Sequence, residues 1–200
     1  MKPIAPLLIA LALLLSAGCA PTPVKVPDYV APPEGPASAK IQVRSPALAG
    51  NGFLHVFDDG ALCTGPHQLA SSATATKAFN ASSRLKAGEP STLLFHYRNV
   101  AKKHCRVAMT FVPEAGRNYL ATAFANEATS CGFILFDITD PTELKPVKRR
   151  ALRTLIPAKD QGAYCRKADL EAEFAKAARP NRSNMKMSDL ADILPPEPAK

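Results

Sequence analysis

Alternating apolar and polar side chains are the feature that most restricts the fold of this chain. In the segment 92–98, Leu93, Phe95 and Tyr97 fall on one face of a strand, because successive side chains of an extended backbone point to opposite faces. The segment 105–112 repeats the pattern, with an apolar residue at every second position. These two segments therefore predict neighbouring β-strands.

Further strand patterns lie on both sides of this pair. The other predicted strands are residues 41–44, 53–57, 83–86, 118–125 and 131–138. The last of these is apolar on both faces, which predicts a central position. Residues 63–80, rich in Ser, Thr and Ala, are predicted to form a long loop or a short helix. Six or seven short strands separated by turns predict a mainly β fold, a single antiparallel β-sandwich of immunoglobulin or transthyretin type.

The chain changes character after residue 140. The sandwich is predicted to span residues 39–165, and a C-terminal helix is predicted over residues 166–179, where Leu170 and Phe174 share a face. Acidic residues come early in that helix and basic residues late, which suits the helix dipole. Residues 180–200 are polar and end in a proline-rich stretch, which predicts a flexible tail.

An apolar run near the N-terminus ends in a cysteine. Residues 3–17 are almost entirely apolar and follow Lys2. The run is shorter than the about 20 residues that a transmembrane helix needs, and it fits the hydrophobic region of an export signal. Small residues occupy positions 16–18, and Cys19 follows them directly.

This arrangement resembles the lipobox of bacterial lipoproteins. The resemblance implies that residues 1–18 form a signal peptide and that Cys19 becomes the lipid-modified N-terminus, which anchors the protein to a membrane. Ala20 implies sorting to the outer membrane, at its periplasmic face. Residues 19–38, with prolines at positions 21, 23, 27, 32, 33 and 36, are predicted to form an extended spacer between the lipid and the domain.

The other cysteines are even in number: Cys63, Cys105, Cys131 and Cys165. In an exported protein they predict two disulfide bonds. Three connectivities are open, of which the sequential pairing of Cys63 with Cys105 and of Cys131 with Cys165 is favoured. No pair has Cys-x-x-Cys spacing, which argues against zinc and thioredoxin-like chemistry, and an oxidising compartment argues against a catalytic thiol.

A basic cluster follows the predicted strands in a chain whose net charge is +8. Between positions 145 and 167 one acidic residue, Asp160, stands among Lys145, Lys148, Arg149, Arg150, Arg153, Lys159, Arg166 and Lys167. Beside an anionic membrane, each basic residue gains about 1 kcal/mol. Lys145, Lys148, Arg149, Arg150 and Arg153 are therefore candidates for binding lipopolysaccharide or phospholipid headgroups, although a solvated basic loop explains the same pattern.

Catalytic and metal-binding patterns do not stand out in the sequence. The histidines, His55, His67, His96 and His104, lack the spacing of metal ligands. The chain also lacks a Gly-x-Ser-x-Gly motif and a phosphate-binding loop. We therefore expect no catalytic residue, no metal and no cofactor. Export and tethering argue against a nucleic-acid partner.

The segment from Ile41 to Lys148 has a cysteine after its second strand, the motif Phe-Val-Pro-Glu-Ala-Gly-Arg-Asn-Tyr at 111–119, and a later cysteine that opens a strand. In these features it is similar to small uncharacterised envelope lipoproteins of Gram-negative bacteria, a likeness that implies a β-sandwich and no particular activity. The expected function is a non-enzymatic structural or protein-interaction module of the cell envelope. A binding module for anionic envelope components is the alternative, and an envelope hydrolase is the least favoured interpretation.

Overall fold

The computed structural model describes residues 25–45, 50–72, 79–125, 131–156 and 163–177. The predicted signal peptide, Cys19 and the predicted tail lie outside these residues. The described part of the chain contains no helix long and apolar enough to cross a membrane.

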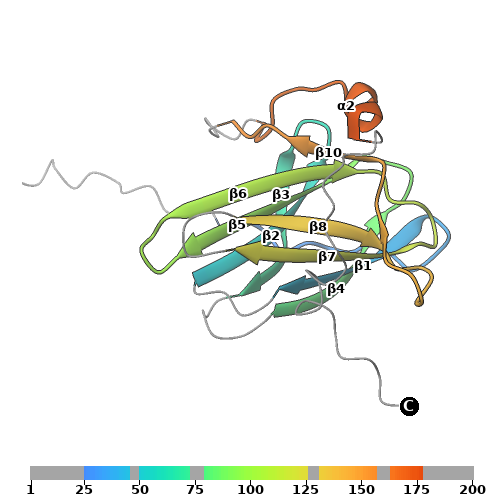
Figure 1. The fold of residues 1–200 in the computed structure, drawn as a ribbon, viewed down its shortest axis with the longest axis horizontal. Coiled ribbons are helices and arrows are strands. Elements are labelled where there is room, and N and C mark those ends of the chain that lie inside the picture. Colours follow the sequence, from blue (N-terminus) through green and yellow to red (C-terminus); the bar gives the residue numbers. More distant parts are fainter. Residues whose placement is uncertain (1–24, 46–49, 73–78, 126–130, 157–162, 178–200) are drawn as a thin grey trace, which may run out of the picture.

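Two five-stranded sheets form the fold (Figure 1). The first has the order β4-β1-β7-β8-β9, with β1 Ser38–Ser45, β4 Phe79–Lys86, β7 Asn118–Ala125, β8 Cys131–Asp137 and β9 Lys145–Pro146. The second has the order β10-β6-β5-β2-β3, with β2 Gly50–Asp59, β3 Thr64–Ser72, β5 Ser91–Asn99, β6 His104–Phe111 and β10 Arg150–Arg153. The predicted mainly β sandwich is confirmed, except that β1 and β7 pair in parallel.

The hydrophobic core lies between the two sheets. Phe95 and Phe111 of the second sheet pack in one cluster with Ile41 and Leu135 of the first, and all four are at most 1% exposed. The alternation predicted for the strands is confirmed, because the side chains at every second position point into this core. On the other face of β8, Phe136 packs against an apolar cluster of its own and is 6% exposed.

The region predicted as a loop or a short helix forms strand β3 instead. It pairs with β2 from Gly52 opposite Ser72 to Asp59 opposite Thr64, with a register shift at Leu54. The prediction over residues 63–80 is wrong for residues 64–72, because β3 lies at the edge of its sheet and is half exposed along most of its length; residues 73–78 lie outside the described residues. Its side chains therefore lack the apolar alternation that marks the inner strands.

The N-terminal segment crosses the open edge of the sandwich between β3 and β4. The backbone N–H of Tyr29 donates to the carbonyl of Gln68 on β3 at 2.9 Å. On β4, Nε of Arg84 donates to the carbonyl of Pro32 at 2.8 Å, and the Tyr29 hydroxyl donates to the Arg84 carbonyl at 3.0 Å. The segment thus bonds to both sheets.

The predicted extended spacer over residues 19–38 therefore lies against the domain in its described part, from Pro27 onward, instead of separating the domain from the membrane. Bonding an edge strand to another segment satisfies backbone groups that a spacer would leave open. The proline-rich composition reflects extended backbone laid against the domain, because proline is tolerated at the edge of a sheet where its missing N–H is not needed.

The C-terminal helix α2, Leu170–Ala177, is shorter than the predicted range 166–179. It begins after Asp169, whose carboxylate accepts a hydrogen bond from the N–H of Ala172 at 3.1 Å, as an N-cap residue does. Phe174 is 4% exposed, and the guanidinium of Arg149 lies 5.2 Å from its ring centroid. The helix lies beside β10 (Figure 1).

Candidate functional site: a basic hairpin

The two predicted disulfide bonds are present, but the favoured pairing is wrong. Cys63 is bonded to Cys165, and Cys105 is bonded to Cys131. Cys105 lies on β6 and Cys131 begins β8, so the second bond joins the two sheets. Because all four sulfur atoms are engaged in disulfides, none of these cysteines is a free thiol nucleophile.

The Cys63–Cys165 bond holds the C-terminal segment against the outer face of the second sheet. Phe57, Leu94 and Ala108 point to that face and are at most 5% exposed, because the disulfide packs on them. Tyr164 and Leu155 are partly buried against the same cluster. Toward the β5–β6 turn the face is open, and this open part carries the candidate site.

Arg153 is a structural residue rather than a binding one. It is 7% exposed, and its guanidinium donates to the carbonyls of Gly60 and Ala61 and to Thr110 Oγ1 at 3.1, 2.7 and 3.0 Å. It also donates to the carbonyl of Arg166 at 3.0 Å. The prediction that Arg153 binds an external anion is wrong, because the residue is buried and both of its terminal nitrogens donate to groups inside the protein.

The other candidates of the 145–167 segment are dispersed. Lys145 lies on β9 in the first sheet and forms an ion pair with Glu143. Arg149 pairs with Glu171 at 2.5 Å. Arg150 donates to the carbonyl of Val147, and Lys148 is exposed. Lys159 lies outside the described residues. Lys145 and Arg150 thus lie on different sheets, and Lys145 and Arg149 are already paired with carboxylates.

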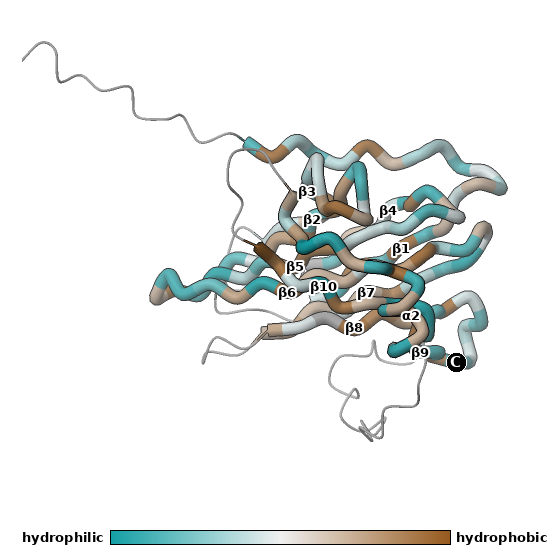
Figure 2. Tube along the Cα trace, turned by 90° about the horizontal axis from the view of Figure 1, so that it is seen from above, coloured by the Kyte–Doolittle hydropathy of each residue, from teal (hydrophilic) through white to brown (hydrophobic). Residues whose placement is uncertain are grey.

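Basic side chains gather instead at the turn between β5 and β6. The basic hairpin, as we name it, carries Arg98, Lys102, Lys103 and Arg106, all exposed. Arg98 pairs with His104 and Arg106 with His96 across the two strands. Directly opposed residues share a face of a sheet, so both arginines lie on the open outer face. Figures 1 and 2 show the turn end of β5 and β6 projecting beyond the neighbouring strands.

The basic hairpin contains no carboxylate. From Pro90 to Pro113 the sequence has no Asp or Glu. In the described part of the chain, the recorded ion pairs involve other cations and leave these four without a carboxylate partner. Unlike Lys145 and Arg149, these four side chains remain available to an external anion.

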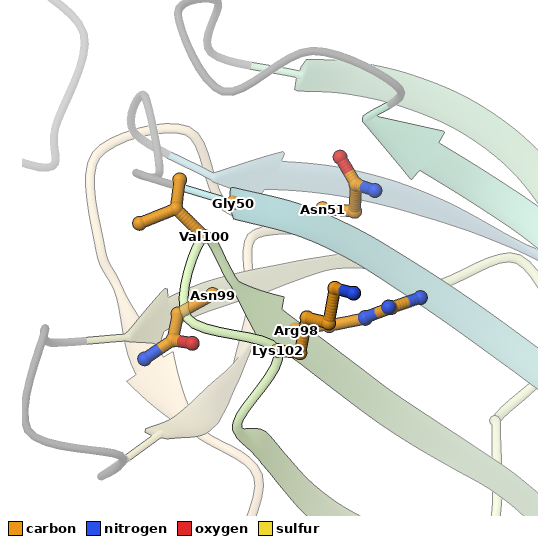
Figure 3. Close-up of a pocket in the computed structure, with 6 residues that line it drawn as sticks. All are labelled: Gly50, Asn51, Arg98, Asn99, Val100 and Lys102. Atoms are coloured by element: carbon orange, nitrogen blue, oxygen red, sulfur yellow. The ribbon is translucent and has the colours of Figure 1, made fainter.

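An open hollow lies beside the turn. It has a volume of about 320 Å³ and is lined by Gly50, Asn51, Arg98, Asn99, Val100 and Lys102. In Figure 3 the side chains of Arg98 and Lys102 extend in the same direction, whereas Val100 points away from them. Gly50 lets β2 approach β5 closely here, since a Cβ atom would lie 2.2 Å from the Arg98 carbonyl oxygen. The hollow can accept a phosphate-sized group beside two cations.

The turn is fixed by hydrogen bonds and contains one unfavourable backbone conformation. The N–H of Lys103 donates to Asn99 Oδ1 at 2.9 Å, and the N–H of Lys102 donates to the Asn99 carbonyl at 3.0 Å. Lys102 has a φ of 61°, the left-handed region that glycine and asparagine favour. A lysine there costs about 1 kcal/mol of folding free energy.

Two histidines are in contact on the open face. Nε2 of His96 lies 2.9 Å from Nδ1 of His104. Burial is the main cause that lowers the pKa of His96 from 6.5 to about 4, and electrostatic repulsion from its neighbours, Arg106 among them, lowers it further. Burial also lowers the pKa of His55. The His96 imidazole is therefore neutral at pH 7, and the charge of the face comes from its lysines and arginines.

The histidine pair is a poor metal site. The described residues contain no group of three or more His, Cys, Asp or Glu side chains that could hold a metal ion. Two imidazoles alone supply half of a tetrahedral zinc shell, and Arg98 and Arg106 beside them repel a cation. The arrangement favours an anionic ligand.

The basic hairpin was not predicted from the sequence, although the sequence contains a signal for it. Arg98 and Arg106 lie in separate predicted strands, so they form no run of basic residues. The absence of carboxylates across the whole hairpin, combined with the pairing of its two strands, would have identified it. No protein-family model matches the chain, and no curated protein matches it. The geometry of the site therefore carries the functional argument.

Proposed function

We propose that this protein is a non-enzymatic lipoprotein of the bacterial cell envelope, anchored at the periplasmic face of the outer membrane through Cys19. Its β-sandwich binds an anionic, phosphate-bearing envelope component. The lipobox-like residues at 16–19 support the anchor, and the paired disulfides suit an oxidising compartment.

The main support for a binding function is the basic hairpin, which contains no Asp or Glu. Four exposed cations lie on one projecting hairpin, and each gains about 1 kcal/mol beside an anionic surface. The segment 145–167, which the sequence favoured, has Arg153 buried and Lys145 and Arg149 paired with carboxylates. The basic hairpin is thus the better candidate for the same chemistry, and it favours an anionic ligand over a purely structural role.

Two charge-reversal variants compare the two sites. Lys102→Glu with Lys103→Glu changes the basic hairpin, and Lys148→Glu with Lys167→Glu changes the 145–167 segment by the same net charge at equally exposed positions. We expect the chain of residues 20–200 to bind phosphatidylglycerol vesicles or lipopolysaccharide in a salt-sensitive manner. The hairpin variant should lose most of this binding, whereas the segment variant should lose little.

Binding that resists salt, or equal loss in both variants, would contradict the proposal. If the domain binds an acidic protein and no phosphate-bearing ligand, the structural or protein-interaction role becomes the favoured function. The chain used retains both disulfides and every strand, since these lie within residues 25–177.

A further inference from the structure

We propose that the basic hairpin docks on an anionic phospholipid leaflet with Val100 inserted at the boundary of the acyl chains and Arg98 and Lys102 at the lipid phosphates. This inference rests on the proposed function and names the partner of its site. Three observations carry it: the shape of the hairpin, the exposure of its apex and the arrangement of its charges.

The hairpin is shaped to reach a flat surface. Its turn end projects beyond the neighbouring strands in two perpendicular views (Figures 1 and 2). The turn is hydrogen-bonded through Asn99 to both Lys102 and Lys103, so it is already in one conformation before contact. A preorganised turn loses little conformational entropy when it docks.

The apex of the hairpin is apolar. Val100 is 79% exposed, and Ala101 beside it is also exposed. The described residues contain three other exposed large hydrophobic side chains, Val30, Leu62 and Leu152. Among these four, Val100 is the one placed at the tip of a projecting turn and flanked by cations that have no carboxylate partner. An apolar apex with basic flanks suits the boundary between headgroups and acyl chains.

The charges are arranged for the headgroup layer. Arg98 and Lys102 line the hollow together, and Val100 points away from them (Figure 3). Because Val100 lies at the apex and Arg98 lies behind it at the end of β5, insertion of the valine at the acyl boundary would bring the cations of the hairpin to the depth of the lipid phosphates. Phosphatidylglycerol supplies that combination of phosphate and hydrocarbon, whereas a soluble phosphate supplies only the first.

Tryptophan at the apex gives a direct test, because the chain contains no tryptophan. Val100→Trp, in the chain of residues 20–200, should show a blue-shifted emission on phosphatidylglycerol vesicles and quenching by brominated phospholipid. Leu152→Trp is the matched control, since Leu152 is 68% exposed on β10, away from the hairpin, and should respond little. If the Val100→Trp protein binds vesicles and its emission shows neither shift nor quenching, the inference is overturned.

Two further variants separate insertion from folding. Val100→Ser should weaken vesicle binding roughly tenfold by removing apolar contact, and Lys102→Gly about fivefold by removing one charge. Lys102→Gly should also leave the melting temperature unchanged or raise it, because glycine accepts the left-handed backbone. If vesicle binding is salt-sensitive but Val100→Ser does not weaken it, the insertion of Val100 is overturned and the proposed function still stands. Failure of the parent chain to bind either vesicles or lipopolysaccharide would reject both.

Discussion

The hydroxyl group of Tyr29 donates a hydrogen bond to the main-chain carbonyl of Arg84, 55 residues along the chain, at 3.0 Å. The backbone N–H of the same tyrosine bonds to Gln68 on the other sheet. Tyr29 therefore joins the edge strands of both sheets, and its ring packs against the core. This contact places the N-terminal segment within the folded unit.

Removing that hydroxyl should destabilise the domain. We expect Tyr29→Phe to lower the free energy of unfolding by about 1 kcal/mol, the usual worth of one intramolecular hydrogen bond. Urea denaturation followed by circular dichroism measures the change. Tyr164→Phe serves as the control, since its hydroxyl has no hydrogen bond recorded within the described residues. Equal losses in the two variants would contradict the role of the Tyr29 hydroxyl.

The two disulfide bonds should differ in their contribution to stability. The Cys63–Cys165 bond spans 102 residues and the Cys105–Cys131 bond spans 26. By the chain-entropy relation, these loops correspond to about 4.7 and about 3.5 kcal/mol. Replacing both cysteines of a bond with alanine and measuring unfolding in urea should show the larger loss for Cys63–Cys165. Peptide mapping without reduction should recover Cys63 joined to Cys165, and a Cys63–Cys105 peptide would refute the pairing.

Arg153 should behave as part of the fold. Arg153→Lys keeps the positive charge but cannot supply the four hydrogen bonds of the guanidinium, so the free energy of unfolding should fall by about 2 kcal/mol. Arg149→Lys, at an exposed position, should change it by less than about 0.5 kcal/mol. The folded Arg153→Lys protein should bind vesicles like its parent. A stable variant with weakened binding would instead support the original assignment of Arg153 to the binding surface.

His96 should make stability depend on pH. Its pKa is about 4 in the folded protein against the usual 6.5, because burial and neighbouring positive charges disfavour the protonated form. Below pH 6.5 His96 binds a proton in the unfolded chain but stays unprotonated in the folded protein. The free energy of unfolding therefore falls as the pH drops from 6.5 to about 4.

The variant His96→Gln isolates this effect from the carboxylates that titrate in the same range. Its free energy of unfolding should fall less than that of the parent over this window, and the His96 ring resonances in NMR spectra of the parent should titrate near pH 4. A ring that titrates near 6.5 would show that burial and the neighbouring charges do not keep the proton off His96.

Cys19 should carry the lipid. Mass spectrometry of the mature protein should find its N-terminus at Cys19 with a diacylglyceryl modification, and Cys19→Ser should either release the protein from the membrane fraction or leave its signal peptide uncleaved. Arg44→Lys, remote from the signal, should leave processing and fractionation unchanged. Normal cleavage with unchanged membrane retention of Cys19→Ser would count against the anchor.

The alternation of apolar and polar residues was sufficient to predict the inner strands but not the edge strand β3. Strands such as β5 and β6 turn every second side chain into the core between the sheets, so core packing imposes the alternation that the sequence displays. Strand β3 lies at an edge, where Gly65 and Pro66 are tolerated and little apolar surface is buried. Its existence follows from pairing with β2, which the residues of β3 alone do not encode.

The disulfide pairing and the binding surface depend on tertiary structure in the same way. Cys105 meets Cys131 because two sheets stack, and Cys63 meets Cys165 because the C-terminal segment folds back. The contiguous cations at 145–153 are divided between two sheets, whereas Arg98 and Arg106 become neighbours through strand pairing. Proximity along the chain was therefore a poor guide to proximity in space.

The docking of the N-terminal segment shortens the tether. From the proposed anchor at Cys19 to Pro27, whose carbonyl accepts a hydrogen bond from the N–H of Gln68, even fully extended backbone spans only about 28 Å. A short tether confines the domain to a thin layer above the bilayer, where the effective concentration of lipid headgroups reaches the millimolar range. At that concentration the hairpin would be bound to lipid most of the time, even if its affinity were too weak to hold an untethered protein on the bilayer. A modest intrinsic affinity of the hairpin would therefore be enough to orient the domain on the membrane.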